Sequence, residues 1–141
     1  MLKSLNQLKT NNNISSTVVL HRSRSGLNAI QSFLGENGYD TQILLDSGEI
    51  DFERESIKIC TLSSVKGLEF DNVFIIDLND DILPYPPGFN GEDDELHIST
   101  ERRLLYTSMT RARERLYLLS SGEPSRYLTE IDEDLLVKAN N

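Results

Sequence analysis

Short apolar runs that lead directly into polar residues constrain the fold of this chain more than any other feature. They occur at residues 17–20, 41–45, 57–62, 72–78 and 116–119. The first and fourth, TVVL and NVFIIDL, are rich in β-branched residues with little alternation. Continuous apolar runs of this kind are typical of parallel strands that are buried on both faces. The sequence therefore predicts five strands.

Helical patterns separate several of these strands. Leu27, Ile30 and Leu34 recur at helical spacing and predict a helix over 25–37, closed by a glycine at position 38. A second pattern predicts a helix from Ser99, as its N-cap, to about Arg113. Strands that alternate with helices indicate an α/β fold whose mainly parallel sheet carries helices on both faces.

The length of 141 residues indicates one domain rather than two. We expect residues 1–16 to be a polar N-terminal segment or linker, 17–128 the folded domain and 129–141 a polar tail. No apolar run approaches the roughly 20 residues of a membrane helix, so no membrane partner is expected and a cytoplasmic location is the default. The single cysteine, Cys60, lies in an apolar run and is expected to be a buried, inert thiol.

The charge of the chain limits its partners. A net charge of −9 argues against an autonomous nucleic-acid binder, because phosphate contacts need clustered Lys and Arg. Five arginines between positions 102 and 115 nevertheless allow a local basic site. The proline- and acid-rich segment 79–97 predicts an exposed loop, with a metal site at Asp80, Asp81, Asp93 and Asp94 as the less favoured alternative.

Polar residues follow two of the predicted strands. His21 and Arg22 follow the first strand, and the segment 63–69 follows the third. Ligands of parallel sheets bind at the carboxyl ends of strands. We therefore expect these residues, together with the end of the helix that begins at Ser99, to lie near one edge of the sheet.

Three blocks carry a family resemblance: VVLHRSRSGLNAIQSFL, TLSSVKGLEFDNVFI and ERRLLYTSMTRARERLYLL. They resemble the second RecA-like motor domain of the UvrD/Rep/PcrA class of superfamily-one DNA helicases, and together they cover most of residues 17–120. The resemblance implies a RecA-like three-layer sandwich. It also implies three partners: single-stranded DNA, an N-terminal RecA-like motor domain, and ATP with Mg²⁺ in the complete enzyme.

The resemblance also implies roles for individual residues at a nucleotide site. Arg22 and Arg111 match the family's arginine fingers, whose planar charged groups stabilise the transferred phosphoryl oxygens. Glu69 matches the residue that contacts the ribose, and Gly67 belongs to the same turn, where it supplies a positive φ. His21 stands where the family usually has a tyrosine that stacks on adenine.

A second set of residues matches family positions beside the DNA backbone. This DNA-binding set is Thr61, Ser63, Ser64 and Lys66, in which short hydroxyls can donate hydrogen bonds to phosphates. Ser63 departs from the family, which usually has a histidine there. The domain that larger relatives insert before residue 57 is replaced by about a dozen residues.

Simpler structural roles compete with these assignments. Arg111 could complement the dipole at a helix C-terminus, Arg22 could be a solvated loop charge, and Glu69 could cap a turn. Arg102 and Arg103 are expected to form a salt-linked helix face rather than DNA contacts.

The phosphate cradle of an ATPase is missing from the sequence. No GxxxxGK[ST] pattern occurs, so the groups that hold the β- and γ-phosphates must come from elsewhere. We expect the isolated chain to hold no cofactor and to lack ATPase activity. The alternative is a non-catalytic nucleotide- or protein-binding module with a degenerate helicase fold, which the acidity, His21 and Ser63 favour.

Overall fold

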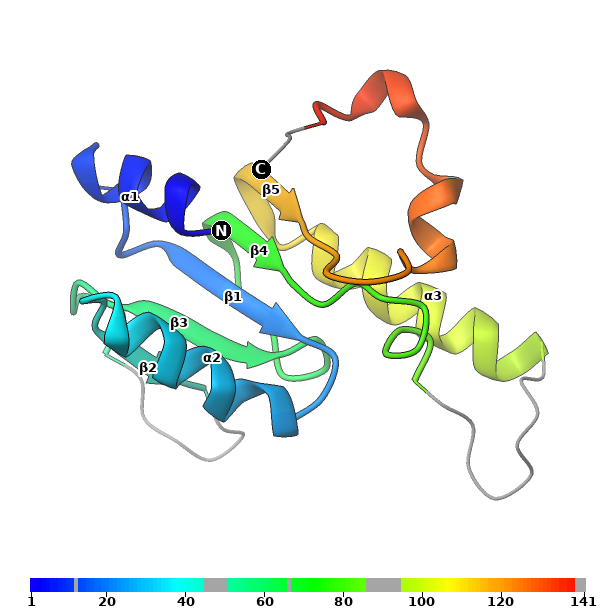
Figure 1. The fold of residues 1–141 in the computed structure, drawn as a ribbon, viewed down its shortest axis with the longest axis horizontal. Coiled ribbons are helices and arrows are strands. Elements are labelled where there is room, and N and C mark those ends of the chain that lie inside the picture. The colour runs from blue at the N-terminus through cyan, green and yellow to red at the C-terminus, as the bar shows by residue number, and fades with distance from the viewer. Residues whose placement is uncertain (12, 45–50, 66, 86–94, 139–141) are drawn as a thin grey trace.

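The computed structural model describes residues 1–11, 13–44, 51–65, 67–85 and 95–138. Figure 1 shows the order of its helices and strands. They are α1 (Leu2–Thr10), β1 (Thr17–His21), α2 (Ser25–Glu36), β2 (Thr41–Ile43), β3 (Ile57–Thr61), β4 (Phe70–Ile75), α3 (Glu95–Met109), β5 (Ala112–Leu118) and the 3₁₀ helices η1 (Arg126–Glu130) and η2 (Glu133–Leu135).

Within the described residues, the five strands form one sheet in the order β2-β3-β1-β4-β5. Every neighbouring pair is parallel, which confirms the predicted α/β fold. The central strands β1 and β3 are buried along their whole length, which explains their continuous apolar sequences. The edge strand β5 begins at Ala112, before the predicted start at 116, because exposed charged residues hide the strand pattern of its first half.

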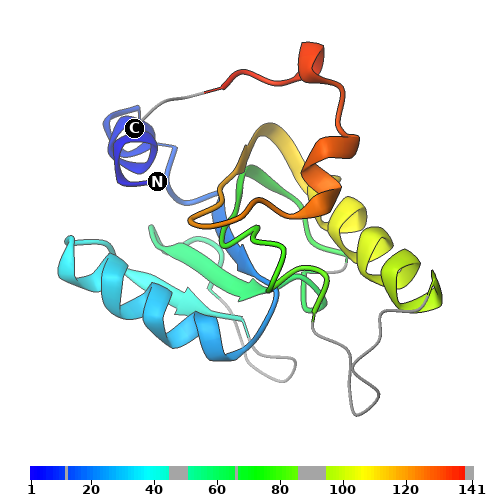
Figure 2. The same ribbon diagram turned by 45° about the vertical axis from the view of Figure 1, so that its right-hand side comes forward.

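One face of the sheet is covered by α1 and α2. Leu5 of α1 and Leu34 of α2 pack with Val19, Ile59 and Phe74 from the strands. Figure 2 shows α2 and α3 on opposite sides of the sheet. The chain therefore has the three layers that the sequence predicted.

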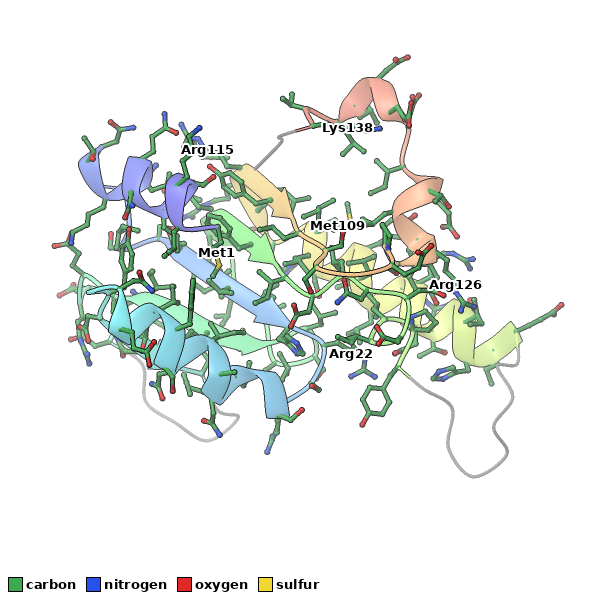
Figure 3. All side chains as sticks on the ribbon, in the orientation of Figure 1. Met1, Arg22, Met109, Arg115, Arg126 and Lys138 are labelled. Atoms are coloured by element: carbon green, nitrogen blue, oxygen red, sulfur yellow. The ribbon has the colours of Figure 1, made fainter. Side chains whose placement is uncertain are left out.

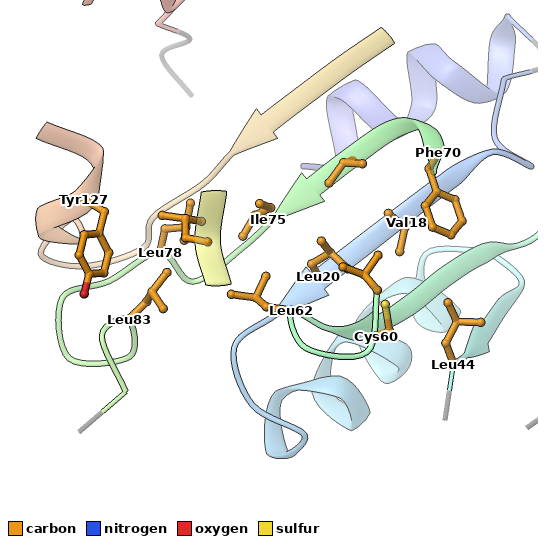
Figure 4. Packing of buried hydrophobic residues seen from close by; sticks show 13 residues of the cluster. Val18, Leu20, Leu44, Cys60, Leu62, Phe70, Ile75, Leu78, Leu83 and Tyr127 are labelled. Atoms are coloured by element: carbon orange, nitrogen blue, oxygen red, sulfur yellow. The ribbon is translucent and has the colours of Figure 1, made fainter. Parts of the chain in front are cut away.

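The other face carries α3 and the segment of eight residues that joins β3 to β4. Leu62 and Val65 from that segment and Leu105 from α3 are buried against the sheet. Figure 4 shows Leu62 beside Leu20, with Tyr127 extending the cluster beyond the strand ends. Cys60 belongs to this cluster, and burial raises the pKa of its thiol to about 12, so the expected inert thiol is found.

The N-terminal segment packs on the domain rather than extending from it as a linker. Leu5 and Leu8 are buried beneath α1, and the hydroxyl of Tyr39 donates a hydrogen bond to Asn6. The buried ammonium group of Lys58 donates to the carbonyl of Ser15 at 2.8 Å. Only two buried leucines distinguish α1 from a polar linker in sequence, which is why its packing was not predicted.

The second predicted helix has other bounds than expected. α3 begins at Glu95 and ends at Met109, so Ser99 lies inside the helix instead of capping it. The segment after β5 forms the 3₁₀ helix η1. Residues 86–94 of the predicted acidic loop lie outside the described residues. None of the described helices is long and apolar enough to span a membrane.

Candidate functional site

A pocket of about 380 Å³ lies where β1 and β3 end. The two strands are neighbours, with His21 beside Thr61, so the segments that follow them meet. The pocket is lined by Arg22, Ser23, Arg24, Thr61, Ser63, Ser64 and Tyr85. The structure thus brings Arg22 together with three of the four residues of the predicted DNA-binding set.

Hydroxyl groups form the floor of this pocket. The Thr61 hydroxyl donates to Ser64 Oγ at 2.9 Å, and Thr61 Oγ1 lies 3.2 Å from Ser63 Oγ. The main-chain N–H of Ser64 donates back to Thr61 Oγ1 at 3.3 Å, so Thr61 closes the turn. Ser63 is exposed. Lys66, the fourth member of the set, lies outside the described residues.

Arg22 is held by the buried carboxylate of Glu101 from α3. Its Nε and Nη2 groups donate to Oε1 and Oε2 of Glu101 at 2.9 and 3.0 Å. Glu101 is only 3% exposed. The guanidinium carbon of Arg22 lies 4.8 Å from the centre of the Tyr85 ring, a cation–π geometry. Arg22 is therefore fixed in orientation and is not a free loop charge.

His21 is buried in a different network. It is 5% exposed, and its Nε2 lies 2.9 Å from Oδ2 of Asp77. The N–H of Ser23 donates to His21 Nδ1 at 3.0 Å. The imidazole links the ends of β1 and β4, and the structure leaves no exposed face on which a base could stack.

Arg111 and Glu69 lie at the amino ends of β4 and β5. The N–H of Phe70 donates to the carbonyl of Arg111 at 2.9 Å. Glu69 and Gly67 are exposed beside it, and Gly67 has the expected positive φ of 79°. Arg111 donates from Nη2 to Thr110 Oγ1 at 3.1 Å. Its Nε is buried and has no hydrogen-bond partner among the described residues.

The structure therefore separates residues that we expected at a single edge. Arg22 follows the carboxyl end of β1, whereas Arg111 precedes the amino end of β5. Glu101, which binds Arg22, is eight residues before the end of α3 at Met109, a length of helix of about 12 Å, and Arg111 follows that end. Figure 3 shows Arg22 and Arg115 of β5 at opposite ends of the sheet. The expectation that the end of the second predicted helix lies at the same edge of the sheet as Arg22 was wrong.

Most arginines with described contacts are paired with carboxylates, whereas Arg111 and Arg115 donate to a hydroxyl and to an amide oxygen. The pairs are Arg22–Glu101, Arg54–Asp40, Arg102–Glu130, Arg113–Asp71 and Arg126–Asp80. Arg102 forms an ion pair as expected, but its partner Glu130 belongs to η1 and not to the same helix, and Arg103 is exposed. The Arg126 guanidinium holds the pKa of Asp80 below its ordinary value. The described residues contain no cluster that could hold a metal ion, and Asp93 and Asp94 lie outside them.

Three residues that line the pocket were missed by sequence reasoning: Ser23, Arg24 and Tyr85. Glu101, which accepts three hydrogen bonds behind the pocket, was missed as well. Only Glu101 leaves a trace in the sequence, because it falls on the same helical stripe as the buried Leu105 and Ser108. A carboxylate on a buried stripe needs a partner.

Residues 28–123 match the family model of the UvrD-like helicase C-terminal domain. The chain belongs to this family.

The individual relatives are named ATP-dependent DNA helicases. Over 108 residues the chain is 36% identical to the ATP-dependent DNA helicase PcrA of Staphylococcus epidermidis and to that of Staphylococcus aureus. The matches cover 69% of this chain and 14% of those proteins. The chain therefore spans a small part of the length of the curated relatives.

Solved structures support the RecA-like fold. The C-terminal domain of a possible DNA helicase from Lactobacillus plantarum superposes with a TM-score of 0.71 at 22% identity, covering 95% of this chain and 72% of that one. The SWI2/SNF2 ATPase core of Sulfolobus solfataricus, solved with double-stranded DNA, gives a TM-score of 0.58 at 11% identity, covering 86% and 24%. At these identities the likeness concerns the fold.

Proposed function

We propose that this chain is the second motor domain of an ATP-dependent DNA translocase, and that it completes an ATP site whose phosphate-binding loop belongs to an N-terminal RecA-like domain. The observation that supports the proposal is that the Nε of Arg111 is buried and has no hydrogen-bond partner among the described residues. A guanidinium N–H that is buried without a partner costs about 1–3 kcal/mol. Arg111 as a whole is only partly buried, and an anionic ligand that binds the exposed part of its guanidinium would offset part of this cost.

Arg111 would act as the arginine finger. Its guanidinium is permanently charged and can stabilise the negative charge that develops on the phosphoryl oxygens during hydrolysis. Glu69, exposed on the neighbouring turn, would accept hydrogen bonds from the ribose hydroxyls. Gly67 allows the turn its positive φ, so that the main chain can pass close to the nucleotide.

The pocket at the ends of β1 and β3 would hold the backbone of single-stranded DNA. Arg22 and the hydroxyls of Ser63 and Ser64 supply the charge and the donors that a phosphate group needs. Because Arg22 is held at this pocket by Glu101, we assign it to DNA rather than to the γ-phosphate. His21 would support the pocket from behind through its contacts with Ser23.

ATP and Mg²⁺ would be bound mainly by the N-terminal domain. The sequence has no phosphate cradle, and the described residues offer no cluster of metal ligands. The groups of this chain that fit the nucleotide are Arg111, Glu69 and the turn at Gly67. When bound, Mg²⁺ and the cradle would supply the charge that holds the β- and γ-phosphates.

The first test concerns the isolated 141-residue protein. We expect no Mg²⁺-dependent ATP hydrolysis with or without single-stranded DNA, because the cradle is absent. Robust turnover that disappears in Arg111→Ala would contradict the proposal, since the chain would then form a complete ATP site.

A second test locates the nucleotide on this chain. Amide NMR signals are followed during titration with an ATP analogue, and we expect shifts at Gly67, Glu69 and Arg111. Arg111→Ala should abolish them, whereas Arg103→Ala, which removes an exposed arginine of α3, should leave them intact. Shifts that persist in Arg111→Ala would favour the alternative, a binding module that does not use the finger.

A further inference from the structure

Glu101 joins three segments that are far apart in the sequence. Its carboxylate accepts two hydrogen bonds from Arg22, which follows β1. It also accepts one from the main-chain N–H of Tyr85, at 2.5 Å, in the segment after β4. Glu101 itself belongs to α3. Two walls of the pocket are thus attached to one helical side chain.

The bidentate pair fixes the orientation of Arg22. Both carboxylate oxygens are used, one by Nε and one by Nη2 of the guanidinium. The third nitrogen, Nη1, has no hydrogen-bond partner in the part of the chain that the structure describes. The Arg22 side chain is 23% exposed and lines the pocket, so its remaining donors are available to a ligand there.

A second contact of α3 reaches the other wall of the pocket. The Ser108 hydroxyl lies 2.9 Å from the carbonyl of Leu104 in its own helix and 3.2 Å from the carbonyl of Leu62, so it shares its hydrogen between the two. Leu62 directly precedes Ser63. The N–H of Arg111 donates to the carbonyl of Ser108 at 3.1 Å. The same helix therefore contacts Arg22, the turn that carries Ser63 and Ser64, and the residue proposed as the finger.

We propose that Glu101 is a positioning residue that orients Arg22 toward a phosphate of single-stranded DNA, and that through α3 it connects this pocket to Arg111. This inference rests on the proposed function of the pocket. It adds that a buried carboxylate with no direct contact to DNA sets the affinity for DNA. A purely structural Glu101 would stabilise the fold without affecting that affinity.

The test measures binding of fluorescent oligo(dT) to the 141-residue protein by anisotropy. Glu101→Gln replaces one carboxylate oxygen with an amide NH₂ group, which is a donor and cannot accept the hydrogen bond from Arg22 Nη2. The remaining oxygen can still accept the hydrogen bond from the N–H of Tyr85. We expect binding to weaken roughly tenfold. Arg22→Ala should have an effect of similar size, and the double variant should bind no more weakly than Arg22→Ala alone.

Glu130→Gln is the matched control. It disrupts another bidentate arginine pair of α3, with Arg102, on the solvent-exposed side of the helix. Binding by Glu130→Gln should equal that of the unchanged protein. A loss equal to that of Glu101→Gln would overturn the inference, because any damage to α3 would then suffice.

Arg22→Lys keeps the charge and leaves Glu101 in place, so it remains informative if Glu101→Gln folds poorly. Lysine cannot form the bidentate pair, and we expect binding as weak as in Glu101→Gln. Wild-type affinity in Arg22→Lys would overturn the inference, since charge alone would explain binding. If Arg22→Ala itself binds normally, the proposed DNA pocket fails as well. If only Arg22→Ala binds weakly, the pocket stands and the role of Glu101 is refuted.

Discussion

At the scale of single residues, Gly26 allows α2 to approach the buried His21. A Cβ atom at Gly26 would lie 2.5 Å from the imidazole ring, closer than real contacts permit. The imidazole is itself held by Asp77 and Ser23, so it cannot move without breaking hydrogen bonds. Gly35, on the same helix, has open space around its Cβ position.

Substitution of these two glycines by alanine should change the free energy of unfolding in opposite directions. Gly26→Ala should lower the free energy of unfolding by about 1–3 kcal/mol through steric strain. Gly35→Ala should raise it by up to about 1 kcal/mol, because alanine is the better helix former. Urea unfolding of both variants measures the difference. Equal effects would show that His21 is not packed against α2 as described.

Arg111 allows a test of whether it is a structural or a functional residue. Arg111→Met removes the unpartnered buried donor, so the free energy of unfolding should be unchanged or higher by up to about 1 kcal/mol. Arg113→Met, which breaks an exposed pair with Asp71, should lower it by at most about 1 kcal/mol. A clear loss in Arg111→Met would support the simpler role as a helix-terminal cation.

At the scale of elements, two charged pairs attach η1 to the rest of the domain. Arg126 donates from its main chain and its guanidinium to Asp80, and Glu130 accepts from Arg102 and Tyr106. Hydrogen bonds from the partner arginines lower the pKa of Asp80 below 3.8 and that of Glu130 below 4.5. Both carboxylates therefore bind protons less readily in the folded state than in the unfolded chain.

The two lowered pKa values determine how the stability of η1 changes with pH. Depressed carboxyl pKa values contribute stability that is fully present above the unfolded values of 3.8 and 4.5 and is lost as the pH falls through the lower folded values. We expect amides 126–130 to lose exchange protection in acid before those of β1. Asp80→Asn should cause part of this loss at neutral pH. Unchanged protection in that variant would contradict the anchoring role.

At the scale of the whole molecule, the net charge of −9 opposes the binding of nucleic acid. The proposed pocket is lined by two arginines, Arg22 and Arg24, so it can attract phosphate locally with only a few cationic groups. Each phosphate contact to a single strand contributes about −0.7 to the slope of log K against log salt concentration.

We therefore expect a shallow salt dependence for oligo(dT) binding by this chain. One or two contacts predict a slope of about −1. Anisotropy titrations between 50 and 200 mM salt, concentrations that bracket roughly physiological conditions, measure it, and Arg22→Ala should flatten it further. A slope steeper than about −3 would mean that the DNA follows another, more basic surface.

The amino-acid sequence by itself determined the class of fold and its main strands. Strand burial and helical period are local properties, so TVVL and NVFIIDL revealed buried strands without knowledge of their neighbours. The motif blocks likewise pointed to Thr61, Ser63 and Ser64, which line one pocket in the structure, because these residues are close in sequence. Exposed charges in the first half of β5 and the few buried leucines of α1 hid those elements.

The tertiary structure alone decided which charges meet. Arg22 and Glu101 are 79 residues apart, and no local pattern encodes a contact across that separation. The order β2-β3-β1-β4-β5 places the pocket after β1 and β3, whereas the start of β5 holds Arg111 at the other end of the sheet. Sequence patterns report how a residue is buried, but the partner of a buried charge depends on how the strands and helices pack.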